Sequence, residues 1–287
     1  MDSTVEASHR KSRRSPAIPP VALCAWPQPH AKDNNVTNKD KAVALITAIG
    51  TGDEAPVAYI NPDEYTQHNA FAPDGVEGFL GFLRHQPPSG YRTHVVRAFE
   101  DGDYVFTHSE GDFGGPMVFF DIFRFRDGLI VEHWDNMQTT VTETVSGHSM
   151  VDGPTEATDL NRTEANKALV KGLIDDVFYG HRWDKLTDYI SSETYIQHNP
   201  SMADGVQGLM AGMAAMAEAG VTMEFSKTHL ILGEGDFVLV QSAGTFGGAE
   251  VTFYDLMRVA GGKVVEHWDV IEPLTAAEGW RNRNGKF

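Results

Sequence analysis

The chain has 287 residues, of which 41% are hydrophobic and 22% are charged, and its formal net charge is −17. These proportions are typical of a globular protein, and no apolar run approaches the roughly 18 residues of a membrane span. The acidity argues against nucleic acid and anionic membranes as partners, because phosphate groups are bound by Lys and Arg. The single cysteine, Cys24, excludes a disulfide framework and a cysteine-based metal site within the chain. We therefore expect a cytoplasmic protein whose partner is a small molecule.

Residues 1–36 differ in composition from the rest of the chain. They are rich in Pro, Ser and Arg and show no hydrophobic periodicity, so we predict a disordered N-terminal tail. Pro16, Pro19 and Pro20 interrupt the one apolar stretch, which makes a signal peptide the less favoured interpretation.

The remaining sequence contains the same motifs twice. Tyr65-Thr-Gln-His-Asn69 returns as Tyr195-Ile-Gln-His-Asn199, and Val131-Glu-His-Trp-Asp135 returns unchanged as Val265-Glu-His-Trp-Asp269. A separation of about 130 residues is too long for a solenoid unit and suits a whole small domain. The chain is therefore predicted to be a duplicated domain. The predicted division is domain 1 over 37–145, a linker over 146–160, domain 2 over 161–275 and a C-terminal tail over 276–287.

Each copy is predicted to contain helices first and long strands afterwards. In domain 1 we expect helices over 38–49, 53–60 and 76–84, a short strand over 65–68, and long strands over 92–99, 103–110, 117–126 and 129–137. In domain 2 we expect helices over 163–179, 183–190 and 208–219, a short strand over 195–198, and long strands over 222–232, 236–244, 250–259 and 264–270. This order predicts an α+β fold in which helices cover one face of a curved, mainly antiparallel sheet and leave a conical pocket between the layers.

The motifs on these elements resemble those of a known family. Tyr-x-Gln-His-Asn lies on the first strand, Asp74-Gly-Val-Glu-Gly78 opens a helix, Asp121-Ile-Phe-Arg124 lies on a late strand and Glu-His-Trp-Asp on the last. Together they are similar to the SnoaL-like branch of the NTF2-like (cystatin-like α+β cone) superfamily, over about residues 38–272. The resemblance implies two cones packed sheet to sheet as an internal pseudo-dimer.

The resemblance also implies an activity. SnoaL-like cyclases are cofactor-free catalysts of aldol closure in which a pocket carboxylate is the base, and the matching positions here are Asp135 and Asp269. We expect a cofactor-independent lyase or isomerase that acts on a small carbonyl or polyketide-like substrate. Two alternatives stay open, namely a non-catalytic binding protein for an apolar metabolite and a metal-dependent enzyme in domain 1.

Strand alternation places His133 and Asp135 on one face of the last strand, with Cα atoms roughly 6.5 Å apart. If this face lines the pocket, Asp135 is the base and His133 relays the proton; His267 and Asp269 match them in domain 2. In the alternative orientation Glu132 and Trp134 face the pocket instead.

His68 ends the short strand, so it is a candidate for stabilising an enolate oxygen, and His198 is its match in domain 2. The alternative for His68 is a structural hydrogen bond to a neighbouring loop or helix. Asp121 lies three residues from Arg124, so the two point to opposite faces. A buried Asp121 needs a partner, and His133 on the adjacent strand is the candidate, either for catalysis or as a structural lock.

Position 108 differs between the copies, since His108 corresponds to Gln241. Convergence of His68, His108 and His133 would make a metal site in domain 1, but no metal-binding spacing supports it and we expect neither metal nor cofactor. The residues expected to bind substrate are Asn69, His108, Tyr65, Trp134, Asn199, Gln241 and Tyr195.

Overall fold

The computed structural model describes residues 36–87 and 89–287, so the predicted N-terminal tail lies outside the described residues except for Val36. The first half contains α1 (Asn38–Thr51), a 3₁₀ helix (Ala55–Tyr59), β1 (Thr66–Gln67), α2 (Gly75–Arg84), β2 (Arg92–Asp101), β3 (Tyr104–Asp112), β4 (Pro116–Arg126) and β5 (Leu129–Thr139). Every predicted element of domain 1 is present, with ends shifted by one or two residues.

The second half repeats this order. It contains α3 (Thr163–Leu173), a π-helical turn (Ile174–Tyr179), a 3₁₀ turn (Trp183–Lys185), α4 (Leu186–Tyr189), β6 (Ile196–Gln197), α5 (Gly205–Glu218), β7 (Met223–Glu234), β8 (Phe237–Phe246), β9 (Ala249–Ala260) and β10 (Lys263–Pro273). The predicted helix 163–179 is therefore continuous but changes its hydrogen-bond pattern after Leu173. The hydroxyl of Thr163, the first residue of α3, accepts a hydrogen bond from the Gly235 N–H at 2.8 Å.

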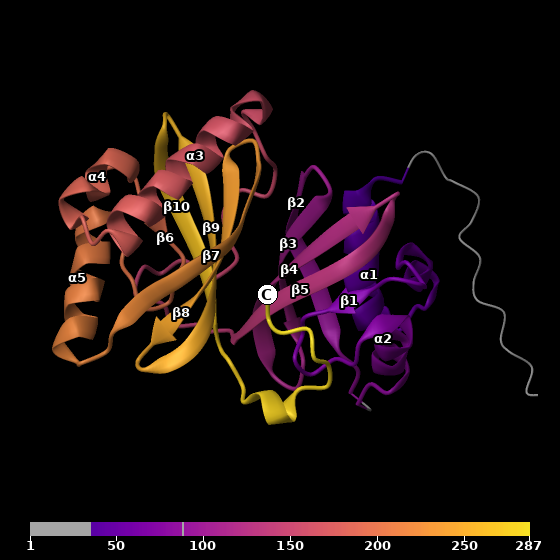
Figure 1. The fold of residues 1–287 in the computed structure, drawn as a ribbon. Coiled ribbons are helices and arrows are strands. Elements are labelled where there is room, and N and C mark those ends of the chain that lie inside the picture. The colour runs from indigo at the N-terminus through magenta and orange to yellow at the C-terminus, as the bar shows by residue number, and fades with distance from the viewer. Residues whose placement is uncertain (1–35, 88) are drawn as a thin grey trace, which may run out of the picture.

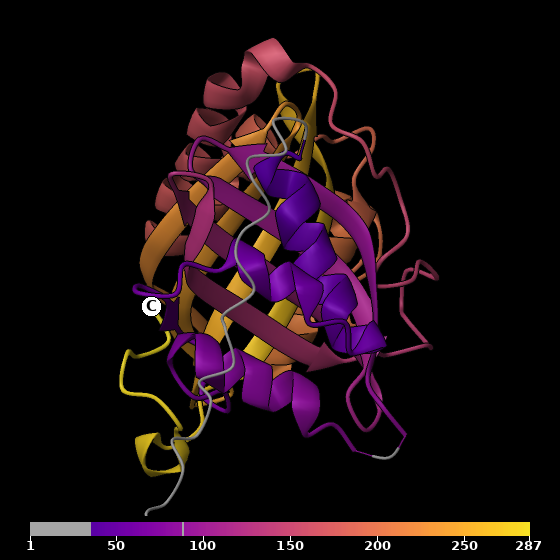
Figure 2. The same ribbon diagram turned by 90° about the vertical axis from the view of Figure 1, so that its right-hand side faces the viewer.

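Each half forms one five-stranded sheet. The strand orders are β1-β5-β4-β3-β2 and β6-β10-β9-β8-β7, and only the short first strand of each half pairs in parallel. The two sheets lie at the centre of the molecule, and the helices cover their outer faces (Figure 1). Seen at right angles, one sheet lies over the other (Figure 2). This is the sheet-to-sheet pseudo-dimer that the family resemblance implies.

Strand alternation sends side chains into separate cores. On β4, Phe119 and Phe123 pack under α1 and α2, whereas Phe120 and Ile122 belong to the core between the two sheets. The central core takes large side chains from both halves, including Phe99, Phe106, Trp134, Phe237, Tyr254, Leu256 and Trp268. A third core lies between the second sheet and its helices. Each sheet is thus buried on both faces, and a polar group on either face needs a partner.

The Asp-Gly-x-x-Gly motif holds the short strand against its helix. Asp74 accepts a hydrogen bond from the Gln67 N–H at 2.9 Å, and Asp204 accepts one from the Gln197 N–H at the same distance. A Cβ atom at Gly78 would lie 2.3 Å from the Pro73 carbonyl oxygen, so this position needs glycine. The motif therefore determines where the short strand and its His-Asn end lie.

The C-terminal segment of the chain crosses to the first half (Figure 1). The Arg281 N–H donates to the Ala70 carbonyl at 2.8 Å, and Asn282 Nδ2 donates to the carbonyls of Asn69 and Ala72. This segment was expected only as a tail after domain 2. None of the helices in the described ranges combines the length and the apolar character that crossing a bilayer requires.

Candidate active site

His133 and Asp135 point to the helix-covered side of the first sheet. The ring of His133 stacks on Phe123, a member of the core under α1 and α2, with centroids 4.7 Å apart. Trp134, between them in sequence, belongs to the core between the sheets. The predicted orientation of His133 and Asp135 is therefore confirmed, and the alternative with Trp134 in the cone is wrong.

Two neighbours determine the position of the His133 ring. Its Nδ1 lies 2.9 Å from Gln67 Oε1, and its Nε2 lies 3.0 Å from Asp121 Oδ1. Gln67 Oε1 also accepts from the Asn69 N–H at 2.8 Å, so its oxygen faces the ring and Nδ1 donates. Both ring nitrogens of His133 therefore face hydrogen-bond acceptors, which fix the orientation of the ring.

Asp121 is the predicted partner of His133 and is nearly buried. Its second oxygen accepts a hydrogen bond from Thr107 Oγ1 at 3.3 Å. Burial raises the pKa of Asp121 above its ordinary value, although the hydrogen bond to His133 opposes this effect. Arg124 points to the other face, where its Nε donates to Glu132 Oε2 at 2.7 Å. The expected opposite directions of Asp121 and Arg124 are thus confirmed.

Asn69 and Tyr65 complete the polar group in the first cone. Asn69 Nδ2 donates to Asp135 Oδ2. Gln67 Nε2 donates to the Tyr65 hydroxyl at 3.2 Å. Burial, together with the charges of Asp135 and Asp121, raises the pKa of Tyr65, so its hydroxyl stays protonated.

The second cone reproduces this arrangement. His267 Nδ1 lies 2.9 Å from Gln197 Oε1, and His267 Nε2 lies 3.1 Å from Asp255 Oδ1. Asn199 Nδ2 donates to Asp269 Oδ2 at 2.7 Å. The side chains of His267 and Asp255 keep 12% and 9% of their surface accessible, so solvent-sized molecules touch the pair.

Burial and charge act in opposite directions on this pair. Burial works to lower the pKa of His267, but the hydrogen bond to Asp255 and the charges of Asp269 and Asp255 outweigh it and hold this pKa above 6.5. Burial raises the pKa of Asp269 above 3.8, and the Asp255 charge adds to it, while His267 opposes it. A buried carboxylate with a raised pKa is suited to general-base catalysis.

His68 and His198 lie on the opposite sheet face, away from the carboxylates in the cones. His68 stacks on Trp134 with centroids 4.9 Å apart, and its Nε2 lies 2.9 Å from Glu132 Oε1. His198 stacks on Trp268 and contacts Glu266 in the same way, at 3.0 Å. A residue that stabilises an enolate would have to point into the cone, and His68 and His198 do not. Their contacts match the structural alternative for His68.

The position that differs between the copies lies between the sheets. His108 stacks on Phe120, and its Nδ1 lies 3.0 Å from Arg97 Nη1; burial and the Arg97 charge lower the pKa of His108. Gln241 Nε2 donates to the Tyr254 hydroxyl at 2.7 Å. His108 and Gln241 therefore lie outside the cones, so the difference between them does not distinguish the two Asp–His groups. His68, His108 and His133 do not converge on a metal site.

One group among the described residues could hold a metal ion, and it lies in the second cone. Asp255, His267 and Asp269 each offer one ligand atom within 4.8 Å of the others. The metal-dependent alternative was expected in domain 1, whereas the group that could hold a metal lies in domain 2.

Sequence reasoning missed Lys286 in the first cone. Its Nζ lies 2.7 Å from Glu272 Oε2 and 3.5 Å from Asp135 Oδ1, and its side chain is 5% exposed. The charges of Asp135 and Glu272 raise its pKa against the opposing effect of burial, which is the largest. The Gln of the Tyr-x-Gln-His-Asn motif was also missed, although its presence in both copies was a usable signal. Lys286 has no such signal.

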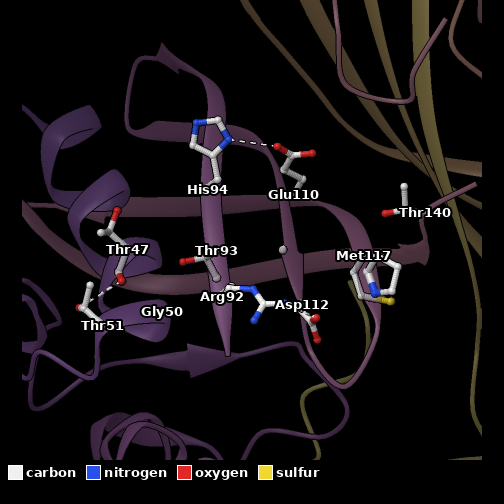
Figure 3. A pocket seen from close by; sticks show the side chains of 12 residues that line it. Thr47, Gly50, Thr51, Arg92, Thr93, His94, Glu110, Asp112, Met117 and Thr140 are labelled. Carbon is white, nitrogen blue, oxygen red and sulfur yellow. Dashed lines mark hydrogen bonds and ion pairs between the residues drawn. The ribbon is translucent and has the colours of Figure 1, made fainter. Parts of the chain in front are cut away.

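A cavity of about 520 Å³ lies between α1 and strands β2–β4 of the first half (Figure 3). Its wall includes Arg92, His94, Glu110 and Met117. Met117 and Asp121 are four residues apart on the same face of β4, with Phe119 between them. A second cavity, of about 510 Å³, lies between the π-helical turn and β7. Neither cavity is lined by the Asp–His groups.

The chain matches a model of the SnoaL-like domain twice, over residues 42–133 and 170–267, which is more than half of its length. No curated protein matches it. Among solved structures, a SnoaL-like polyketide cyclase from Agrobacterium tumefaciens is 10% identical, with a TM-score of 0.31 over 37% of this chain and 91% of its own. IdmH from Streptomyces antibioticus, a candidate polyketide cyclase, is 25% identical, with a TM-score of 0.30 over 35% and 91%.

A candidate ketosteroid isomerase from Kribbella flavida is 14% identical, with a TM-score of 0.33 over 40% of this chain and 83% of its own. The two matches to the SnoaL-like domain coincide with the two cones described above. The chain therefore belongs to the SnoaL-like family and carries the domain in tandem.

Proposed function

We propose that this protein is a cofactor-independent lyase or isomerase that moves a proton adjacent to the carbonyl group of a small molecule. The observation that carries the proposal is the carboxylate of the last strand, present in each cone as Asp135 and Asp269. Each carboxylate lies on the helix-covered face beside an imidazole that is fixed by a glutamine and a second aspartate.

The proposed chemistry uses each residue of this group. The last-strand aspartate abstracts the α-proton, and the electron pair of the broken C–H bond forms an enolate. The His–Asp pair (His133–Asp121 or His267–Asp255) keeps the electrostatic environment of the base fixed. The proton held by the last-strand aspartate then returns to the enolate and completes the transfer. Such general acid–base catalysis contributes about 10²–10⁴-fold in rate. The cyclase and isomerase descriptions of solved relatives agree with this reaction class.

The test is proton exchange in heavy water. A panel of small ketones and β-dicarbonyl compounds is incubated with the protein, and loss of the α-proton signal is followed by ¹H NMR. We expect exchange with the native chain and a loss of about 100-fold or more in the Asp135→Asn/Asp269→Asn double variant, with unchanged circular dichroism. Exchange that continues at the native rate in the double variant would remove these carboxylates from the mechanism.

A binding protein for a small metabolite is the second candidate. It is favoured by the cavities under α1 and beside β7, which are lined by residues other than the Asp–His groups. This candidate predicts saturable binding of a metabolite with no turnover, and binding that the double variant retains.

A further inference from the structure

The two cones differ in how their carboxylate oxygens are paired. In the first cone all four oxygens have partners: His133 and Thr107 on Asp121, and Asn69 and Lys286 on Asp135. In the second cone only Asp255 Oδ1 and Asp269 Oδ2 have partners. Among the described residues, neither Asp255 Oδ2 nor Asp269 Oδ1 has a hydrogen-bond partner, although both atoms are buried.

Two sequence differences cause this inequality. The residue paired across the strands with Asp121 is Thr107, and the residue paired with Asp255 is Val240, which has no hydroxyl. The second difference lies in the segments along the sheet edges, where Lys286 in one half corresponds to Met150 in the other.

The correspondence of Lys286 and Met150 follows from matched hydrogen bonds. The Arg281 N–H donates to the Ala70 carbonyl, and the Val145 N–H donates to the Pro200 carbonyl. The two donors are 136 positions apart in the sequence, and the two acceptors are 130 positions apart. The ring Nδ1 of His68 donates to the Gly285 carbonyl at 2.8 Å. His198 Nδ1 donates to the Ser149 carbonyl at 2.7 Å. The next residue is Lys286 in one segment and Met150 in the other.

The partner of Lys286 changes together with it. Glu272 accepts from the Met137 N–H at 3.2 Å, and Gln138 accepts from the Ile271 N–H at 2.9 Å in the equivalent position. A charged pair, Lys286 with Glu272, thus stands where the other half has the neutral residues Met150 and Gln138. The first carboxylate is neutralised by a fixed ammonium group, and the second is left open.

Buried carboxylate oxygens without partners are costly, and natural proteins retain few of them. Here two occur in one small group, together with the imidazole of His267. The two oxygens themselves are buried, but the side chains of His267 and Asp255 keep 12% and 9% of their surface accessible, and a ligand that enters the group there would supply the missing hydrogen-bond donors. Two unpaired acceptors fit a ligand with two donors. With the proposed proton transfer, one of them is the acidic C–H at Asp269 and the other is a hydroxyl group at Asp255.

We propose that domain 2 is the reactive half of the protein, that Asp269 is its base, and that its substrate is a hydroxylated carbonyl compound whose hydroxyl group donates to Asp255 Oδ2. Lys286 pairs with Asp135, the matching aspartate in domain 1, and prevents it from acting as a base. This assignment rests on the proposed proton-transfer function and names the half and the substrate class.

The step balances without any added reagent. The Cα–H bond of the substrate breaks, its proton passes to Asp269 Oδ1, and its electron pair forms the enolate. The proton, or a deuteron from solvent, then returns to carbon. The groups that face Asp269 are His267, Asp255, Asn199 and the buried hydroxyl of Tyr195.

The probe for the test is 3-hydroxybutan-2-one, and butan-2-one is the matched compound without a hydroxyl group. Deuterium exchange at the α-position is measured for the native chain and for single Asp269→Asn and Asp135→Asn variants. We expect Asp269→Asn to reduce the rate at least tenfold more than Asp135→Asn does. We also expect the hydroxyketone to bind at least tenfold more tightly than the ketone, because its hydroxyl completes the buried pair of acceptors. An equal or larger loss with Asp135→Asn overturns the assignment of the reactive half.

The role of Lys286 is tested by exchanging the two residue pairs. Lys286→Met with Glu272→Gln gives domain 1 the Met150 and Gln138 pattern, so in an Asp269→Asn background it should restore exchange at least tenfold. Met150→Lys with Gln138→Glu should suppress exchange in domain 2. Failure of both double changes to alter the rate overturns the role of Lys286.

Binding separates a failure of this inference from a failure of the proposed function. If the native chain exchanges no α-proton, the proposed function fails, and chemical-shift changes on adding 3-hydroxybutan-2-one still test the site. Shifts confined to the second cone and removed by Asp255→Asn would support the substrate class. Absence of binding, or a stoichiometric divalent metal at Asp255, His267 and Asp269 in the purified protein, would overturn it.

Discussion

The charge on the His267 ring depends on two carboxylates and one amide. Gln197 Oε1 accepts a hydrogen bond from the Nδ1–H of His267, and Asp255 Oδ1 faces Nε2. Because the pKa of His267 is raised above its unfolded value, the charged ring stabilises the folded chain fully below pH about 6.5. This contribution is lost as the pH rises through the raised folded value.

Replacing Asp255 tests this account of His267. In an Asp255→Asn variant the hydrogen bond to a charged acceptor is lost while burial remains, so the pKa of His267 should fall below that of the native chain. The measurement is the titration of the His267 ring protons by NMR. The matched control is Asp236→Asn, a change at a buried aspartate whose carboxylate accepts from the Thr158 N–H at 2.6 Å. An unchanged His267 titration in Asp255→Asn would contradict the account.

A second prediction at this scale concerns the ion pair of Lys286 and Glu272. Lys286→Met leaves the largely buried Glu272 without its cation, and breaking a buried pair in this way costs about 3 kcal/mol of unfolding free energy. Adding Glu272→Gln removes the stranded charge, so the double variant should recover most of that loss. Urea denaturation measures both. A single variant as stable as the double variant would show that the pair carries no net charge interaction.

The elements were predictable because their patterns are long. Alternation over β4 and β5 decided which face His133 and Asp135 share, and the helical stripe of 163–179 was read correctly through its π turn. His68 was harder to place, because it follows a strand of two residues whose direction depends on the Asp74 side chain. Lys286 could not be found, since the segment around it is short, has no periodicity and is held by backbone carbonyls of the other half.

Removing residues 281–287 tests the C-terminal segment as an element. The truncated chain loses the hydrogen bonds to Gln67, His68, Asn69, Ala70 and Ala72. We expect faster amide hydrogen exchange around β1 and no comparable change around β6, whose edge is covered by residues 145–150. Equal protection of β1 in the full and truncated chains would show that the segment does not hold that edge.

At the scale of the whole molecule, the core between the sheets joins the two halves. Phe99 stacks on Phe237 across the halves at 4.4 Å, and the Arg97 guanidinium lies 4.5 Å from the centre of the Trp268 ring. Arg97 also donates to the carbonyls of Val151 and Asp152. The family resemblance implied this pairing of sheets, whereas the contacts of Arg97 with Val151 and Asp152 depend on the linker, which carries none of the repeated sequence motifs.

Trp268→Ala tests the shared core. The side chain is fully buried, and deleting a buried Trp costs about 3–5 kcal/mol. Since residues of both halves pack on it, unfolding should remain one transition and move to lower denaturant for both sheets. Trp280→Ala, outside this core, is the control. Loss of stability confined to the second half would contradict a shared core.

The most direct test of the central claim is the pH dependence of α-proton exchange in the native chain and in Asp269→Asn. The base works only when ionised, and burial raises the pKa of Asp269, so the native rate should increase with pH through an inflection above 3.8. The variant should lose that inflection together with most of the rate. An identical profile in both proteins would contradict the assignment of Asp269 as the base.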